Sequence, residues 1–285
     1  MTGWEAALLG VVQGVFMFVP VSSTSHLVLT QHLLIALGSD LPAPESASMI
    51  LFDLVVHVGT MVSVAIVFRR SLVRLVGGAW NDLRGVGRRD RLSLRLIGLG
   101  AISVLATGAV GFPARELFGS VFAHPTVVAL ALAGTGALLF ASDRLRRGRH
   151  GLADLTIAIA IGIGVAQGLA LLPGFSRSGL TIVVALLMGV RRRWAGEYSF
   201  FLAVPTILGA TLLQATDVLR SVDGVVLGLA PMAIGFAVAA VVGAFALWAV
   251  MRILLAARFR WFAYYVWAVA AVVLITGTFP DVRPF

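Results

Sequence analysis

The chain has 285 residues, of which 59% are hydrophobic and 12% are charged, about half of the roughly 25% that a soluble domain carries. Several apolar runs approach or exceed the roughly 20 residues that a helix needs to span a bilayer, which excludes a soluble fold. The chain contains no cysteine, which excludes disulfides, thiol catalysis and cysteine-ligated metals. All 22 basic residues are arginines, and with 13 acidic residues they give a net charge of +9. We attribute this positive charge to the loops of a membrane protein and expect no nucleic-acid partner.

The first half of the chain predicts a broken hairpin followed by three spans. Residues 4–19 and 22–37 are apolar with helical periodicity, and Pro20 interrupts them. Neither run is long enough to span a bilayer comfortably by itself. The spans are predicted at 49–68, 93–112 and 124–141. Residues 69–95 hold eight arginines and are predicted to lie in the cytoplasm, with 84–95 as a solvated loop.

The second half repeats this order. Residues 152–172 and 177–190 flank Pro173, and both outer ends of the pair are basic. We therefore expect a hairpin that enters from the cytoplasm and turns back within the membrane. Further spans are predicted at 197–217, 225–251 and 261–279.

The distribution of arginine orients the chain. With this topology 18 of the 22 arginines lie in the cytoplasm, and only Arg115, Arg220 and Arg283 lie outside. The remaining one is Arg177, at the tip of the second hairpin.

Each hairpin returns to the side of the membrane from which it entered, and three spans follow it. Because three is an odd number, the second half starts on the opposite side and is inverted relative to the first. We expect an all-α polytopic membrane protein with one integral membrane domain, 1–285, built from two inverted repeats of about 1–145 and 150–285. The pairs Gln13-Gly14 and Gln167-Gly168 precede the two breaks at matching positions. Interrupted segments at matching positions of inverted halves indicate a central site.

The second tip has the residues of an anion site. Glycines permit close approach of the backbone, a helix starting near Ser176 directs N–H groups at the tip, and Arg177 supplies a planar donor fork suited to phosphate. The residues in this group are Gly174, Ser176, Arg177, Ser178 and Thr181. The alternative is an arginine paired with a buried carboxylate, with the serines acting as helix caps.

The first tip supplies reactive groups. Ser22 is placed to cap the helix over 22–37, and His26 shares a helix face with Ser22 and Ser23. A histidine can act as nucleophile, base or acid near neutral pH. The alternative is a histidine satisfied within the protein interior.

Three further polar residues lie in apolar surroundings. Asp53 and His57 are four residues apart and share a helix face. They act either as a ligand or proton relay, or as a pair in a packed helix interface. We expect Glu197 to neutralise nearby arginines.

At these residues the chain resembles the undecaprenyl-diphosphatase family of the bacitracin-resistance type. The motifs that carry the resemblance are Gln13-Gly14, Phe18-Val19-Pro20-Val21-Ser22-Ser23-Thr24-Ser25-His26, Phe52-Asp53-Leu54-Val55-Val56-His57-Val58-Gly59-Thr60, Leu172-Pro173-Gly174-Phe175-Ser176-Arg177-Ser178-Gly179, and Glu197-Tyr198-Ser199-Phe200-Phe201-Leu202-Ala203-Val204-Pro205. They cover almost the whole chain in order.

The resemblance implies a hydrolase of the bacterial inner membrane that converts undecaprenyl diphosphate to the monophosphate and phosphate, at a site open to the outer face. This reaction recycles the lipid carrier of cell-wall synthesis and confers bacitracin resistance. The implied site residues are Gln13, Ser22 or Ser23, His26, Ser176, Arg177, Ser178 and Thr181. The implied partners are the isoprenyl diphosphate and membrane lipids, and a homodimer is left open.

One position departs from the family pattern, which has Glu or Gln, three residues, and then Glu. Here Gln13 fits, but the second position is Met17. Methionine is a poor ligand for Mg²⁺ or Ca²⁺, so a cation cofactor is in doubt, with Asp53 or Glu197 as a substitute ligand. Met17 leaves two alternatives open besides hydrolysis: a lipid-phosphate transporter, or a catalytically weakened paralogue.

Overall fold

The computed structural model is built from helices and describes residues 1–44, 46–85, 91–122, 125–172, 174–220 and 228–276. Within those ranges one isolated bridge, His150 with Val190, is the only pairing of extended residues. The helices are α1 (Gly3–Phe16), α2 (Ser23–Ala36), α3 (Ala47–Val67), α4 (Arg69–Leu83), α5 (Leu92–Phe122), α6 (Pro125–Ser142), α7 (Ile157–Leu169), α8 (Arg177–Leu187), α9 (Arg192–Arg220), α10 (Leu229–Leu255) and α11 (Arg260–Thr276).

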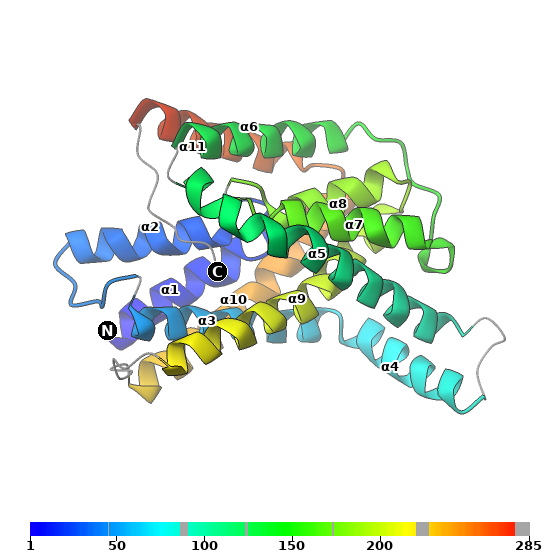
Figure 1. The fold of residues 1–285 in the computed structure, drawn as a ribbon, viewed down its shortest axis with the longest axis horizontal. Helices are drawn as coiled ribbons and strands as arrows, with labels where there is room; N and C mark the ends of the chain where they lie inside the picture. The colour runs from blue at the N-terminus through cyan, green and yellow to red at the C-terminus, as the bar shows by residue number, and fades with distance from the viewer. Residues whose placement is uncertain (45, 86–90, 123–124, 173, 221–227, 277–285) are drawn as a thin grey trace.

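The two predicted hairpins are present, and they approach each other from opposite ends of the molecule. Helices α1 and α2 occupy one end and α7 and α8 the other, so that the two turns meet near the middle (Figure 1). The Oγ of Ser178, at the start of α8, lies 3.5 Å from the carbonyl oxygen of Phe18, just after α1. The break at Pro20 is confirmed, whereas Pro173 lies outside the described residues.

Each hairpin packs its first helix against a helix of the other half of the chain. Helix α1 packs on α10 and α7 packs on α5, while α11 packs on α6. Glycines allow the first two contacts to be close: a Cβ on Gly14 would lie 2.9 Å from the backbone nitrogen of Gly243, and one on Gly168 would lie 3.0 Å from the carbonyl oxygen of Thr107. Small residues spaced four apart are the usual means of close helix packing in membranes.

The contact of α1 with α10 and the contact of α7 with α5 are the two contacts that the predicted inverted-repeat symmetry would make equivalent. The repeat itself, and the division into halves of about 1–145 and 150–285, stay predictions.

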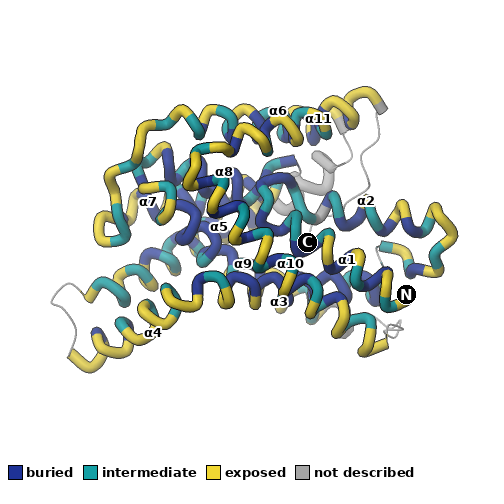
Figure 2. Tube along the Cα trace, turned by 180° about the vertical axis from the view of Figure 1, so that it is seen from behind, coloured by how far each residue is buried: buried dark blue, intermediate teal, exposed yellow. Residues whose placement is uncertain are grey.

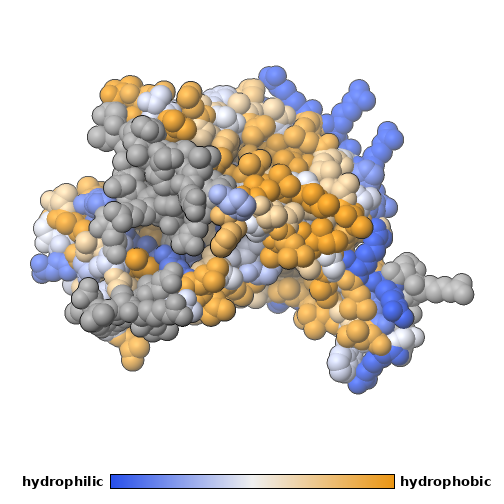
Figure 3. Space-filling model, in the orientation of Figure 1, coloured by the Kyte–Doolittle hydropathy of each residue, from blue (hydrophilic) through white to orange (hydrophobic). Residues whose placement is uncertain are grey.

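Among the residues that the structure describes, four helices are long and apolar enough to cross a bilayer: Ala47–Val67, Leu92–Pro113, Arg192–Thr216 and Leu229–Leu255. The spans predicted at 124–141 and 261–279 form the shorter apolar helices α6 and α11. The apolar body and the hydrophilic edge beside α4 and the α6–α7 connection are visible in Figure 3.

The arginine-rich stretch 69–95 begins with helix α4, whose apolar residues have helical spacing. Of the predicted loop at 84–95, residues 92–95 form the start of α5, and 86–90 lie outside the described residues. Asp82 also accepts hydrogen bonds from the N–H groups of Ser93 and Leu94, which joins the end of α4 to the start of α5.

Gly14→Ala tests the close contact between α1 and α10. The added methyl group would meet backbone atoms of α10, which cannot move aside, so we expect a loss of about 1–3 kcal/mol in stability and a lower unfolding temperature in detergent. Gly98→Ala in α5 is the control, because nothing lies within 4 Å of its Cβ position and alanine favours a helix. Equal stability of the two variants would contradict the close contact.

Candidate functional site

The first tip is a tight turn with a left-handed residue. Ser22 has φ 45° and ψ 90°, a conformation that L residues seldom adopt. Ser22 stands at the cap position of α2, as predicted, but its side chain makes no capping bond. With its backbone in this conformation, its hydroxyl instead lies 2.9 Å from the Oγ of Ser25.

The second tip has the predicted helix start. Ser176 caps α8 and accepts a hydrogen bond from the N–H of Gly179 at 3.2 Å. Gly174 has φ 88°, which favours glycine, and its carbonyl accepts a bond from Thr135 Oγ1 at 3.1 Å. The positive end of the α8 dipole is therefore held at the tip.

The sulfur of Met17 is where the two tips converge. It accepts three donors: Gln13 Nε2 at 3.5 Å, Ser23 Oγ at 3.9 Å and Arg177 Nη2 at 3.7 Å. Met17 itself is buried. Three predicted site residues thus meet at the position where the chain departs from the family pattern.

Arg177 brings a positive charge into this contact. Within the described part of the chain the one ion pair is Arg193 with Glu197, so Arg177 has no carboxylate at ion-pair distance there. This disfavours the alternative of a carboxylate-paired arginine.

Ser178 and Thr181 are buried beside Arg177 but are engaged in local bonds. Thr181 Oγ1 donates back to the carbonyl oxygen of Arg177 at 2.8 Å, and Ser178 Oγ is 3.4 Å from Ser176 Oγ. Their hydroxyl oxygens can still accept hydrogen bonds, and the Ser178 hydroxyl can rotate to donate to another acceptor.

His26 has a defined environment at the first tip. Its Nδ1 lies 2.8 Å from the carbonyl oxygen of Ser22, which can only accept, so Nδ1 carries a proton. Its Nε2 lies 2.6 Å from the hydroxyl of Tyr265 on α11, and its ring stacks on Phe16 at 3.9 Å between centroids. In the neutral ring Nε2 therefore holds the lone pair, and Tyr265 donates to it.

The contacts of His26 in the structure do not include Arg177, although we expected both residues at one central site. Among the described residues, the ring of His26 contacts Ser22, Tyr265 and Phe16. The reason is the turn at residues 17–22, which directs His26 toward α11 while Ser23 faces Met17.

The other predicted polar residues have partners outside the two tips. Asp53 is buried and accepts a bond from Gln31 Nε2 at 2.9 Å, and His57 Nδ1 lies 2.7 Å from the carbonyl oxygen of Asp53. Glu197 lies 3.8 Å from Arg193, which confirms that it neutralises an arginine.

The residues at the tips do not fit a hard divalent cation. Such a cation needs several oxygen ligands, and Gln13 and Met17 offer one amide oxygen and a sulfur that already accepts three donors. No cluster of three or more His, Asp or Glu suited to a metal occurs within the ranges that the structure describes.

Sequence reasoning missed two contributors. Met17 drew attention as a lost ligand, whereas its sulfur is the shared acceptor. Tyr265 stood in an apolar run, where a phenolic hydroxyl was the only signal, and 239 residues separate it from His26.

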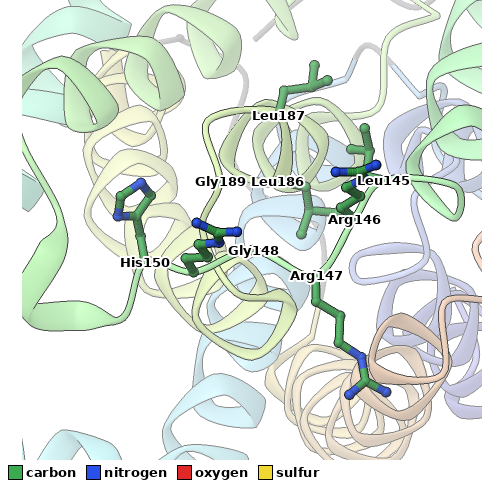
Figure 4. A pocket seen from close by; sticks show the side chains of 9 residues that line it. Leu145, Arg146, Arg147, Gly148, His150, Leu186, Leu187 and Gly189 are labelled. Atoms are coloured by element: carbon green, nitrogen blue, oxygen red, sulfur yellow. The ribbon is translucent and has the colours of Figure 1, made fainter.

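A hollow lies at the arginine-rich end, between the α6–α7 connection and the end of α8. Figure 4 shows its lining, in which Arg146 and Arg147 point in different directions rather than toward one ligand. The tips, where donors converge, are the stronger candidate for a catalytic site.

Met17→Glu tests the convergence at the tips. A carboxylate here would pair with Arg177, so we expect a higher unfolding temperature than in Met17→Gln, which has the same shape without the charge. The difference should disappear when Arg177→Ala is added to both variants. A lower temperature for Met17→Glu than for Met17→Gln would show that Arg177 does not face position 17.

Comparison with known proteins gives one consistent result. The family described as bacitracin resistance protein BacA matches residues 6–272. The undecaprenyl-diphosphatase of Alkalilimnicola ehrlichii is 54% identical over 276 residues, covering 95% of each chain. That of Halorhodospira halophila is 51% identical, covering 96% of this chain and 98% of its own, and that of Carboxydothermus hydrogenoformans is 34% identical, covering 96% and 97%.

Proposed function

The chain belongs to the bacitracin resistance protein BacA family, and we propose that its two hairpin tips form the site of its reaction. The protein is a membrane phosphatase that dephosphorylates undecaprenyl diphosphate. The observation that carries the proposed site is the convergence of Arg177, Gln13 and Ser23 from two hairpins on one buried point.

Arg177 and the start of α8 would hold the diphosphate. A phosphoryl transfer gathers negative charge on the phosphate oxygens, and positioned donors stabilise that charge. Arg177 offers a guanidinium without a carboxylate partner among the described residues, and the first turn of α8 offers backbone N–H groups. Ser176, Ser178 and Thr181 would supply further hydrogen bonds, and Gly174 would let the phosphate approach.

The attacking group has two candidate sources. In a direct route, His26 Nε2 takes a proton from water, whose oxygen bonds the terminal phosphorus while the bridging P–O bond breaks. In a covalent route, His26, Ser22 or Ser23 attacks the phosphorus, and water later hydrolyses the phosphoenzyme. The lone pair on Nε2 supports His26 in either route, although its ring must turn from Tyr265 toward Arg177.

The arginine distribution supports an orientation with the basic end in the cytoplasm. The first hairpin then enters from the outer side of the bacterial inner membrane, and the lipid diphosphate would reach the tips from that side. Release of the monophosphate there would return the lipid carrier to cell-wall synthesis. The family's name links this activity to bacitracin resistance.

Hydrolysis at these tips would proceed without a divalent cation bound between them, since Gln13 and Met17 provide no carboxylate. Positive charge would come from Arg177 instead. The rival readings are transport of a lipid phosphate without hydrolysis and a binding protein without activity, both of which the loss of a carboxylate at position 17 favours.

The first test is phosphate release from a long-chain isoprenyl diphosphate by the purified protein in detergent. We expect release in Mg²⁺, in Ca²⁺ and in chelator alike, and a loss of roughly 100- to 1000-fold in Arg177→Ala, because one transition-state donor contributes about that much. His26→Ala should also abolish it, and a trapped phosphohistidine or phosphoserine would identify the covalent route.

Loss of release in chelator would overturn the cation-free proposal while leaving the phosphatase intact. No release under any condition, with lipid binding retained, would move the assignment to a binding protein. Movement of a labelled lipid phosphate between leaflets would then identify a transporter.

Tyr265→Phe tests the role of His26. The variant removes the hydroxyl that donates to Nε2 but keeps the ring, so folding should be preserved. We expect kcat not to fall and its pH dependence to shift, because the ring no longer has to leave Tyr265 before it faces Arg177 and has lost the donor to its Nε2 lone pair. Phe16→Leu, which removes only the stacking partner, serves as a comparison. An unchanged pH profile in Tyr265→Phe would argue against His26 as the proton-transfer group.

A further inference from the structure

Helix α4 exposes an apolar face that nothing in the described structure covers. Val73, Val76, Trp80 and Leu83 recur with helical spacing and are 72%, 66%, 55% and 69% exposed. Residues at such spacing share one side of a helix. Figure 2 shows α4 exposed along most of its length, beside the buried centre of the molecule.

This face cannot turn inward, because the opposite side of α4 is fixed to α5. Asp82 Oδ2 accepts hydrogen bonds from the N–H of Ser93 at 3.0 Å and of Leu94 at 3.2 Å. Gly78 lies against the side chain of Ser93, and Ala79 is buried. The apolar face is therefore held outward by the fold.

A third face of α4 is basic. Arg70, Arg74 and Asn81 are exposed on one side, and the single acid of the helix, Asp82, is used by α5. Arg84 lies over the ring of Trp80, with 4.4 Å between Cζ and the ring centroid. A tryptophan flanked by arginines is suited to the zone between acyl chains and phosphates.

The position of α4 points to the same surroundings. The spanning helix α3 ends at Val67 and α4 begins at Arg69, so α4 starts at the level where the apolar surface of α3 ends. Ile66, in the last turn of α3, is itself exposed. The apolar face of α4 thus continues an apolar surface that faces lipid.

We propose that α4 is an interfacial helix that binds the anionic phospholipids of the leaflet at the basic end of the molecule. Val73, Val76, Trp80 and Leu83 lie at the boundary of the acyl chains, and Arg70, Arg74 and Arg84 contact the lipid phosphates. Amphipathic helices with basic polar faces bind membranes in this way, through apolar burial and charge together.

The absence of cysteine makes the depth of α4 measurable in the full chain. Val76→Cys and Asn81→Cys, each carrying a spin label, place one probe on the apolar face and one on the polar face. In phosphatidylcholine–phosphatidylglycerol vesicles, the label at 76 should collide several-fold more often with oxygen than with a water-soluble nickel complex. The label at 81 should show the reverse preference, and Val73→Cys repeats the test if Val76→Cys does not fold.

The charge contribution is tested by Arg70→Gln with Arg74→Gln. When this variant is purified from nanodiscs that contain both lipids, we expect the ratio of bound phosphatidylglycerol to bound phosphatidylcholine to fall several-fold. Arg146→Gln with Arg147→Gln removes the same charge from another loop and should change retention less. Equal losses in both variants would overturn the assignment of the anionic lipid to α4.

Two results at position 76 would overturn the proposal. Free access of the nickel complex would mean that the face is solvated. Exclusion of both oxygen and nickel, with a short label-to-label distance between molecules, would mean that a second copy of the chain covers it.

Discussion

The arrangement depends on holding a partly buried guanidinium between two hairpins of a membrane protein. Taking a charge away from water is costly, and a carboxylate partner is the usual compensation. Within the described residues Arg177 has none, and its contact at the tips is the neutral sulfur of Met17. The rest of the fold can be understood as the support of this charge, since the start of α8 and the meeting of the two hairpins place polar groups around it.

Close helix packing makes that support rigid. Because Gly14 and Gly168 let α1 and α7 approach the backbones of α10 and α5, each hairpin is held by a helix from the other half of the chain. A broken hairpin lacks the length to anchor itself in a bilayer, so its position must come from such neighbours. The distance between the two tips is therefore set by helix packing within about two turns of them.

Sequence reasoning succeeded where the signal is local. Pro20 marked a break, Ser176 marked the start of a helix, and the spacing of apolar residues located the spans. It failed where contacts join distant parts of the chain: Tyr265 reaches His26 from α11, and Met17 gathers donors from both tips. The helix α4 was missed for a different reason, because its arginines suggested solvent although residues between them are apolar on one side.

At the basic end of the molecule, including α4, the positive charge comes from arginine and not from lysine. A guanidinium stays protonated at any pH that a cell meets, whereas a lysine ammonium begins to lose its proton in strongly alkaline surroundings and can be acetylated. The uneven distribution of basic charge along the chain is therefore independent of pH and of lysine-directed modification. A membrane protein with such a distribution keeps its positive charge when the medium turns alkaline.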